Sequence, residues 1–406
     1  MMLIKIAWRN VWRNKTRSLI ILLAVALGLW GGIFSDAFMN GMARQQVYTT
    51  IHTETGDIQI NRSGFRLNRD LQLRIANADS LSLALQHQAG VKAIAAVTQL
   101  TAMVSTTAGS AGVLLNGIDA PAYARVSDLP EHLLQGTFFA GSGSDPALIS
   151  QRLADKLHLK LHSRLVLTMQ TVSGDITYAS FRVTGIFRTA DNEYDQEMLF
   201  VRNEDLKPVI GFPAADASLL VVMLQSDQDA AGEAAQLSRH LAGLQVQSWE
   251  QLSPVLELVT GKTNLITFIF VGIILVALAF GIVNTMLMAV LDRTREIGML
   301  LAIGMKPSRI FGMILLETVF LSATGAVVGV CFGVAGIAWF GRTGINLSMI
   351  AEGFNALGYS SIVYPYLAPG FYLILSGMVV VIALVAGWVP AARAMRLRPA
   401  AAIRGT

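Results

Sequence analysis

The chain has 406 residues and a mass of 43.7 kDa; 53% of its residues are hydrophobic, whereas only 14% are charged. An average soluble domain carries about 25% charged residues, so this composition disfavours an ordinary soluble enzyme. The apolar content, with a mean hydropathy of +0.53, also excludes intrinsic disorder. The single cysteine excludes an intrachain disulfide, and the formal net charge of +4 is mild.

Four apolar stretches are long enough to cross a bilayer as helices, which takes about 20 residues. None of them contains a Lys or Arg in its interior. They predict transmembrane helices at residues 18–39, 263–291, 310–340 and 369–392. The first stretch follows a basic start, as a signal peptide does. Its apolar run exceeds the usual length of about 7–15 residues, so we expect an uncleaved anchor.

Charges outside these stretches predict the orientation. Residues 1–17 and 393–406 are basic without any acidic residue, and residues 292–309 carry a basic excess. The loop 341–368 carries only one Arg and one Glu. By the positive-inside rule, the three basic segments are cytoplasmic. We therefore expect both termini to lie in the cytoplasm and residues 40–262 to lie outside, in the periplasm.

Residues 40–262 hold 17 basic and 22 acidic residues, so the basic excess of the chain lies next to the predicted spans. Lys and Arg at that place meet anionic lipid, which argues for the bilayer and against nucleic acid as a partner. Alternating and β-prone segments predict strands in this region, and capping residues with apolar periodicity predict helices. The expected strands are 56–60, 99–107, 111–118, 164–171, 177–187, 198–201, 219–225 and 244–247, and the expected helices are 150–157, 228–241 and 249–262.

Three segments partly match motifs for nucleotide or metal binding, but each lacks the other residues that its motif requires. Residues 261–263 (GKT) resemble the end of a phosphate-binding loop, but Leu256 stands where that motif needs Gly, and a span begins here. His158 and His162 lack the companions of a metal site. The acidic run 191–197 lacks the spacing of a calcium-binding loop, so we expect a solvated loop. We therefore expect no catalytic, cofactor-binding or metal-binding residue in this chain.

The segment between the second and third spans is the most informative one. Its apolar residues recur at helical spacing and predict a short helix, which Gly304 and the following Lys-Pro end. A short helix between two spans can transmit force from a soluble partner. It can also be a plain reverse turn with an interfacial helix, and the residues alone leave both open.

Three motifs resemble the FtsX-like permease domain of the MacB and lipoprotein-releasing ABC transporters. The run 284–304 (NTMLMAVLDRTREIGMLLAIG) is similar to the family's R-x-x-E-[IV]-G-x-L-x-A-x-G pattern. Residues 390–404 (PAARAMRLRPAAAIR) resemble its closing motif, and residues 7–18 (AWRNVWRNKTRS) its opening motif. The resemblance covers essentially the whole chain in the same order: one span, a large periplasmic domain, then three spans.

The resemblance implies a membrane protein with four transmembrane α-helices and an α+β periplasmic domain between helices 1 and 2. That domain would comprise a porter-like part and a β-rich, sabre-like insert within about residues 120–215. The helix of the 292–309 loop would dock into a soluble ABC ATPase, expected in two copies, which would bind ATP and Mg. The implied ATPase-coupling residues are Arg293, Arg295, Glu296, Ile297, Gly298, Leu301 and Gly304. Leu301 departs from the pattern, because a basic residue often precedes the Ala there.

The stretch 147–201 resembles the lipoprotein-releasing permeases in particular, and the chain begins with the basic segment, as in their split layout. This implies extrusion of lipoproteins from the outer leaflet of the bacterial inner membrane, with a second permease and possible transfer to a periplasmic carrier. The hairpin 166–183 is short and lacks Pro, unlike the hook that recruits the carrier. The alternatives are MacB-like mechanotransmission, which exports peptides or toxins from the periplasm, and FtsX-like regulation of a cell-wall hydrolase.

Extrusion of a lipid-anchored substrate needs an apolar chamber near the outer ends of the first two spans. The expected chamber residues are Phe34, Phe38, Leu265 and Phe268, although aromatic side chains at this level also face lipid. Gly325, Gly329 and Gly333 form a ladder of small residues, which packs either within the chain or at a dimer interface. Glu317 lies in the third span, where a carboxylate must face protein, water or the interface.

Overall fold

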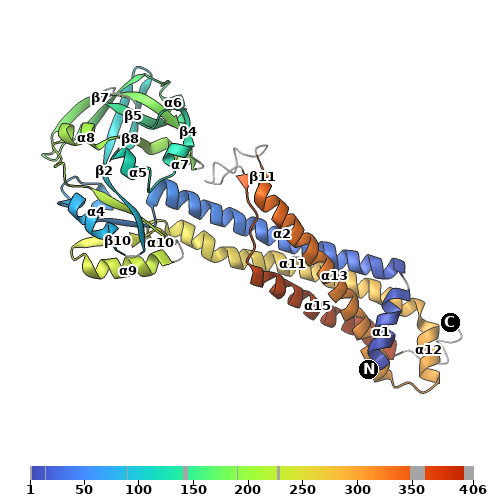
Figure 1. The fold of residues 1–406 in the computed structure, drawn as a ribbon. Coiled ribbons are helices and arrows are strands. Elements are labelled where there is room, and N and C mark those ends of the chain that lie inside the picture. The colour runs from blue at the N-terminus through green and yellow to red at the C-terminus, as the bar shows by residue number, and fades with distance from the viewer. Residues whose placement is uncertain are drawn as a thin grey trace. The chain divides into compact units, whose positions relative to one another are not determined.

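The computed structural model describes residues 2–13, 15–88, 90–139, 145–189, 191–225, 229–347 and 362–396 (Figure 1). The chain divides into two compact units. The helical unit comprises the described residues up to Ala43, from Gly261 to Asn346 and from Ile362 onward. The mixed unit comprises the described residues from Arg44 to Thr260 and Leu347. Arg398 and Arg404 of the closing motif, and the loop 141–144, lie outside the described residues.

The helical unit contains four helices that are long and apolar enough to cross a membrane. Two of them continue beyond the predicted spans, because the polar residues after Ala43 and before Gly261 belong to the other unit and need no lipid. The helices are α1 (Met2–Arg13), α2 (Lys15–Thr49), α11 (Pro254–Asp292), α12 (Thr294–Ala302), α13 (Pro307–Thr343) and α15 (Pro369–Met395). A π-helical turn, η1 (Thr50–Thr55), follows α2, and β11 (Ile345–Asn346) pairs with β12 (Ile362–Val363).

The glycine ladder of α13 packs against α2 of the same chain. A Cβ atom added at Gly325, Gly329 or Gly333 would lie 2.8 Å from an atom of α2. Larger side chains would therefore force the two helices apart, as expected where small residues let helix backbones approach closely. The structure thus places the ladder in a contact within the chain.

One half of the mixed unit is a four-stranded antiparallel sheet with strand order β10-β1-β9-β2. In chain order this half reads β1 (Ile58–Arg62), α4 (Ala78–Gln86), β2 (Val91–Thr106), β9 (Leu219–Leu224), α9 (Ala230–His240) and β10 (Leu244–Ser248). This is the split β-α-β pattern with two helices. The apolar residues Leu85 and Leu237 of the two helices join the core of the sheet, and β9 is buried along its whole length.

The other half is a ring of six strands, formed by the second part of β2 and by five strands that lie between β2 and β9 in the chain. The second part of β2 pairs with β3, and the ring continues through β8, β5, β7 and β6 back to β2. Leu167 of β6 and Phe181 of β7 are buried, whereas Tyr178 is exposed, as the inside–outside alternation of a small barrel requires. The strands are β3 (Gly109–Ile118), β5 (Pro146–Ser150), β6 (Arg164–Gln170), β7 (Ile176–Phe187) and β8 (Met198–Arg202), and β4 (Leu133–Gly136) extends the sheet beside β7.

Short helices complete the mixed unit. They are α3 (Phe65–Asn68), α5 (Ala120–Tyr123), the 3-10 helix η2 (Leu129–His132), α6 (Gln151–Lys156), α7 (Asn192–Glu197), α8 (Asn203–Ile210) and α10 (Trp249–Leu252). The Ser150 hydroxyl accepts a hydrogen bond from Leu153 N at 3.1 Å, so it caps α6 as the sequence predicts.

The fold class is confirmed: four candidate transmembrane helices, with an α+β domain between the first and second. The expectation of a solvated loop at 191–197 is wrong. Asp191 accepts hydrogen bonds from Glu193 N and Tyr194 N, which caps α7, and Asp195 is only 1% exposed. The insert also starts earlier than predicted, because β2 continues from the four-stranded sheet into the ring.

Candidate functional site

The helix α12 occupies the segment between the second and third spans and presents two different faces. Ile297 and Gly298 are buried against the helical unit. Met299 and Ile303, four residues apart, are 54% and 81% exposed. Gly304, at φ +95°, adopts the left-handed conformation that ends a helix. The helix therefore has a buried face against the spans and a largely exposed apolar face, whose Met299 and Ile303 border a cavity beside α1.

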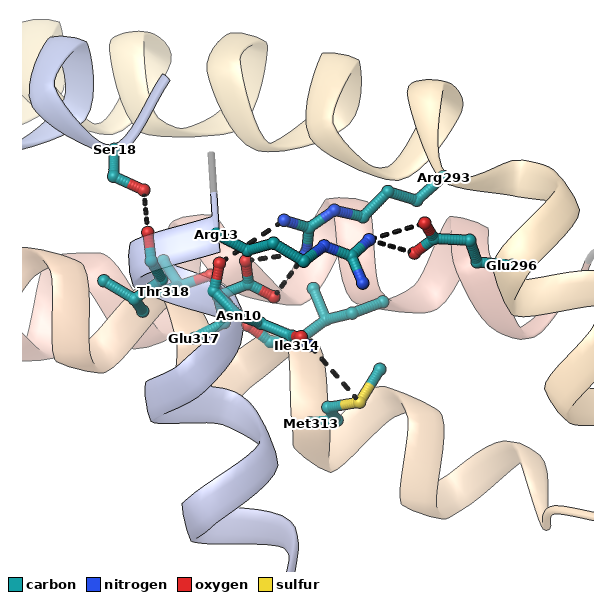
Figure 2. Close-up of polar contacts among 10 residues, drawn as sticks. Asn10, Arg13, Ser18, Arg293, Glu296, Met313, Ile314, Glu317 and Thr318 are labelled. Atoms are coloured by element: carbon teal, nitrogen blue, oxygen red, sulfur yellow. Dashed lines mark hydrogen bonds and ion pairs between the residues drawn. The ribbon is translucent and has the colours of Figure 1, made fainter. Parts of the chain in front are cut away.

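A buried ion pair anchors the start of α12. Arg293 follows α11 directly, and its Nη1 donates hydrogen bonds to both carboxylate oxygens of Glu317 on α13, at 3.0 and 3.4 Å (Figure 2). Its Nη2 donates to the main-chain oxygen of Asn10 on α1 at 3.4 Å. The two side chains are 13% and 9% exposed. Arg293 thus ties the turn before α12 to two other helices and gives Glu317 its charge partner.

An exposed ion pair joins α12 to the N-terminal helix. Arg13, the last residue of α1, donates hydrogen bonds to the carboxylate of Glu296 (Figure 2). Both side chains are about half exposed, at 51% and 52%. The hydrogen bond from the guanidinium to Glu296, together with the negative charge there, raises the pKa of Arg13, which therefore stays charged. Glu296 is accordingly held by the same chain rather than free for a partner.

The helix α1 is itself fixed to the spans. Ala7 and Val11 are fully or almost fully buried, and Trp8 packs edge-on against Phe320 of α13 with ring centroids 5.6 Å apart. The Ser18 hydroxyl donates to the main-chain oxygen of Val11, which closes the turn between α1 and α2. A cavity of about 340 Å³ remains between α1, α11, α12 and α13, lined by both arginines and both glutamates of the ion pairs. The four helices thus form one connected site.

The structure gathers the predicted coupling residues in this site but gives them different surroundings. Arg293, Ile297 and Gly298 face inward, and Leu301 is half buried. Arg295, Glu296 and Gly304 are exposed. Their role toward an ATPase stays a prediction. The sequence reasoning gave no role in this site to Asn10, Arg13 or Met299; helical spacing alone could have grouped Arg295, Met299 and Ile303 on one face. No sequence signal pairs Arg13 with Glu296, 283 positions away.

The predicted chamber residues do not converge on one cavity surface. Phe34 stacks on Trp30 with centroids 5.7 Å apart and meets Phe340 of α13 at 5.9 Å. Leu265 and Phe268, on α11, are 62% and 53% exposed. Phe38 is partly buried. Phe34 therefore packs within the bundle, whereas the two α11 side chains face the surroundings of the chain.

Within the described residues, no three His, Cys, Asp or Glu side chains gather closely enough to hold a metal ion. The backbone of residues 261–263 is helical as part of α11, not the loop that a phosphate-binding motif requires.

Comparison with known families agrees with this arrangement. The family of MacB-like periplasmic core domains matches residues 18–239, which is more than half of the chain. The family described as FtsX-like permease C-terminal matches residues 268–399, which include α12 and three spans.

Several curated relatives are similar along almost the whole chain. The uncharacterized ABC transporter permease YknZ of Bacillus subtilis is 25% identical over 99% of this chain and 98% of its own length. The pyoverdine export ATP-binding/permease protein PvdT of Pseudomonas aeruginosa is 25% identical over 98% of this chain. The chain spans only 58% of the length of that relative.

Among solved structures, the extracellular domain of YknZ from Gram-positive bacteria covers 47% of this chain and 99% of its own, at 20% identity and a TM-score of 0.33. The periplasmic region of MacB from Actinobacillus actinomycetemcomitans covers 51% of this chain and 94% of its own, at 13% identity and a TM-score of 0.35. The particular similarity to lipoprotein-releasing permeases stays a prediction. The two family matches follow one another in the order of the two domains described above. The chain therefore belongs to the family of ABC transporter permeases that combine a MacB-like periplasmic core domain with an FtsX-like permease domain.

Proposed function

We propose that an ABC ATPase drives this permease through α12. Four spans are too few to enclose a path for a large substrate, so two permease chains, identical or paralogous, pair with two copies of a soluble ATPase that binds ATP and Mg. In this arrangement α12 and both termini lie in the cytoplasm. The large domain lies in the periplasm, and the spans cross a bacterial inner membrane.

The two faces of α12 are the observation that carries this proposal. The outer face offers Met299 and Ile303 to a partner, with the exposed Arg295 beside them. Arg293, which directly precedes α12, ties the helix to α13, and Glu296, on the same exposed side as Ile303, ties it to α1. Because α12 has an exposed apolar face for a partner and fixed contacts to α13 and α1, a displacement of the helix by that partner would be passed on to the spans.

We propose lipid-anchored proteins as the cargo, extruded from the outer leaflet and passed on to a periplasmic carrier or to another acceptor. Exposed apolar side chains of α11, including Leu265 and Phe268, provide a surface on which acyl chains can lie. The sequence likeness of residues 147–201 to lipoprotein-releasing permeases supports the same cargo.

A second candidate is export of a soluble molecule from the periplasm by movement of the large domain, without entry of lipid. The observation that favours it is the set of relatives whose printed names describe export of pyoverdine. In that case residues of the inserted barrel, and not those of α11, determine the cargo.

Charge placed on the outer face of α12 tests the coupling. We expect Met299→Asp and Ile303→Asp each to reduce recovery of the ATPase with the tagged permease by about 10-fold, because a charged side chain opposes burial in an apolar interface. Leu83→Asp, at a helix position of the mixed unit that is 62% exposed, is the matched control and should leave recovery unchanged. Undiminished recovery with both α12 variants would refute docking at this face.

Reconstitution tests the cargo. Proteoliposomes with the permease, the ATPase and a triacylated lipoprotein should release the lipoprotein to a soluble carrier only with ATP. Leu265→Ser and Phe268→Ser should lower release while ATP hydrolysis persists, since both side chains are exposed and their loss leaves the fold intact. Transport that is indifferent to acylation and to these variants would support the second candidate.

A further inference from the structure

A carboxyl group is buried in the first span without a partner for one of its oxygens. Asp36, on α2, is 3% exposed, and its Oδ2 has no hydrogen-bond partner. Across the contact with α11, Thr267 is 5% exposed, and its hydroxyl oxygen also has none. Asn40 Nδ2 donates to the main-chain oxygen of Asp36 at 3.0 Å. The side chains of Thr267 and Asn40 both lie near the Asp36 carboxyl group, yet its Oδ2 keeps unused hydrogen-bonding capacity.

A small cavity lies between these groups. It measures about 10 Å³ and is lined by Asp36 and Thr267 together with Ser35, Met39 and Phe270. A space of this size holds about one water molecule or one ammonium group. Phe270 also lines it and is 51% exposed, so the cavity adjoins the outer surface of the helical unit. The terminal nitrogen of a head group can therefore enter the cavity while the rest of the head group and the acyl chains stay outside.

The depth of the site limits what can enter it. Asp36 lies 18 residues after Ser18, or about 27 Å along a helix that rises about 1.5 Å per residue. The hydrocarbon core is about 30 Å thick, so a span beginning near Ser18 carries Asp36 to the level where acyl chains join their polar heads. An acceptor buried there requires a hydrogen-bond donor or a cation, since an unsatisfied carboxylate is strongly disfavoured.

We propose that Asp36 and Thr267 form a binding site for an N–H donor carried by a diacylglyceryl lipid. Two sources share this chemistry: the ammonium group of phosphatidylethanolamine, and the amino or amide nitrogen at the acylated end of a lipoprotein. The carboxylate accepts from the nitrogen, and the Thr267 hydroxyl adds a second polar contact. Exposed Ile269 and Ile273 on α11 lie beside the acyl chains. The lipoprotein source rests on the proposed function, whereas the binding chemistry does not.

Native mass spectrometry of the purified, delipidated permease tests the chemistry. The probes are phosphatidylethanolamine, phosphatidylcholine and phosphatidylglycerol with identical acyl chains. Phosphatidylcholine carries the positive charge without an N–H group, so it separates hydrogen bonding from charge alone. We expect phosphatidylethanolamine to bind about 10-fold more tightly than either of the others. Equal binding of the three lipids would overturn the proposal.

Variants locate the site. Asp36→Asn should remove the preference for phosphatidylethanolamine, and Thr267→Val should weaken it. Thr285→Val is the matched control, because the Thr285 hydroxyl is exposed on the same helix and donates to Gly281 O at 2.7 Å. A preference that survives Asp36→Asn, or is lost equally in Thr285→Val, would contradict the assignment.

A competition experiment separates the two sources. A diacylated lipopeptide with a free amine and a triacylated one with only amide N–H groups are added to permease loaded with phosphatidylethanolamine. Displacement by either lipopeptide supports cargo as the source, and retention of the phospholipid supports a resident lipid. Neither experiment uses the ATPase, so failed release in proteoliposomes with intact lipid binding refutes the proposed function and leaves the site in place.

Discussion

Two buried acidic side chains of the helical unit have opposite surroundings. Glu317 is 7% exposed and accepts two hydrogen bonds from Arg293. Asp36 is 3% exposed and has an oxygen without a partner. Both carboxyl groups have lost their contact with water, but of the two only Glu317 lies beside a compensating positive charge. A paired buried carboxylate holds helices together, whereas an unpaired one is kept at a cost to stability, and such a cost is typical of a binding position.

The largest expected effect comes from breaking the paired site. Glu317→Ala leaves the Arg293 guanidinium buried without its partner, which should destabilise the helical unit by about 3–5 kcal/mol. The thermal midpoint of the permease in lipid nanodiscs, followed by tryptophan fluorescence, measures this. The double variant Arg293→Met with Glu317→Leu should recover most of the loss, because apolar side chains can replace a buried ion pair. A double variant no more stable than Glu317→Ala would contradict the account.

The unpaired site should respond with the opposite sign. Asp36→Leu removes a buried carboxyl group that has one oxygen without a donor, and it should stabilise the protein by about 1–3 kcal/mol. The same nanodisc measurement, in lipid without N–H donors, checks the sign. Phosphatidylethanolamine should reduce the difference in stability between the two proteins, because it binds and stabilises the wild-type protein but not Asp36→Leu. A marked loss of stability in Asp36→Leu would show that the carboxyl group is already satisfied.

A buried carboxyl group in the mixed unit sharpens the comparison, because Asp195 has hydrogen bonds but no ion pair among the described residues. Thr189 donates to it from its main-chain N and from its hydroxyl at 2.8 Å. Burial raises the pKa of Asp195 above its ordinary value; the Thr189 hydrogen bonds and Arg152 oppose this, and Asp191 adds to it. The native state therefore keeps the proton to higher pH than the unfolded state does.

Stability should consequently fall as the pH rises from the ordinary carboxyl pKa of 3.8 through the raised pKa of Asp195, and then level off. In Asp195→Asn, this contribution should disappear. Thermal midpoints of the wild-type protein and of the variant at a series of pH values from acid to neutral measure the difference. Parallel curves for the two proteins would mean that the group does not titrate as described.

The smallest effect on stability is expected at the exposed pair. Arg13→Glu should change the free energy of unfolding by less than about 1 kcal/mol, because both partners are half exposed. Coupling should respond more strongly. If Glu296 acts through Arg13, Glu296→Arg should uncouple ATP hydrolysis from transport, and combining it with Arg13→Glu should restore coupling. No restoration in the double variant would indicate that Glu296 contacts the ATPase directly.

The sequence predicted the parts of this molecule that depend on local pattern. Apolar length identified the four spans, and β-prone apolar runs with turn signals identified most strands, because these signals lie within one segment. The first part of β2 and all of β5 were missed, since their residues are buried on both faces or lack alternation. At the site, the motif led to α12 but could not show which residues face inward. That depends on contacts such as Arg293 with Glu317 and Arg13 with Glu296, which only the folded chain brings together.

The strand β2 has a mechanical consequence. Its 16 residues pair with β9 in the four-stranded sheet and then with β3 and β6 in the barrel. A slip of one residue would turn the alternating second part, Leu100–Val104, away from the barrel core, so that core fixes the register of the whole strand. Because both halves share this strand, a movement of the barrel relative to the sheet must distort a backbone that is hydrogen-bonded in both of them. The shared strand therefore couples the two halves of the periplasmic domain mechanically.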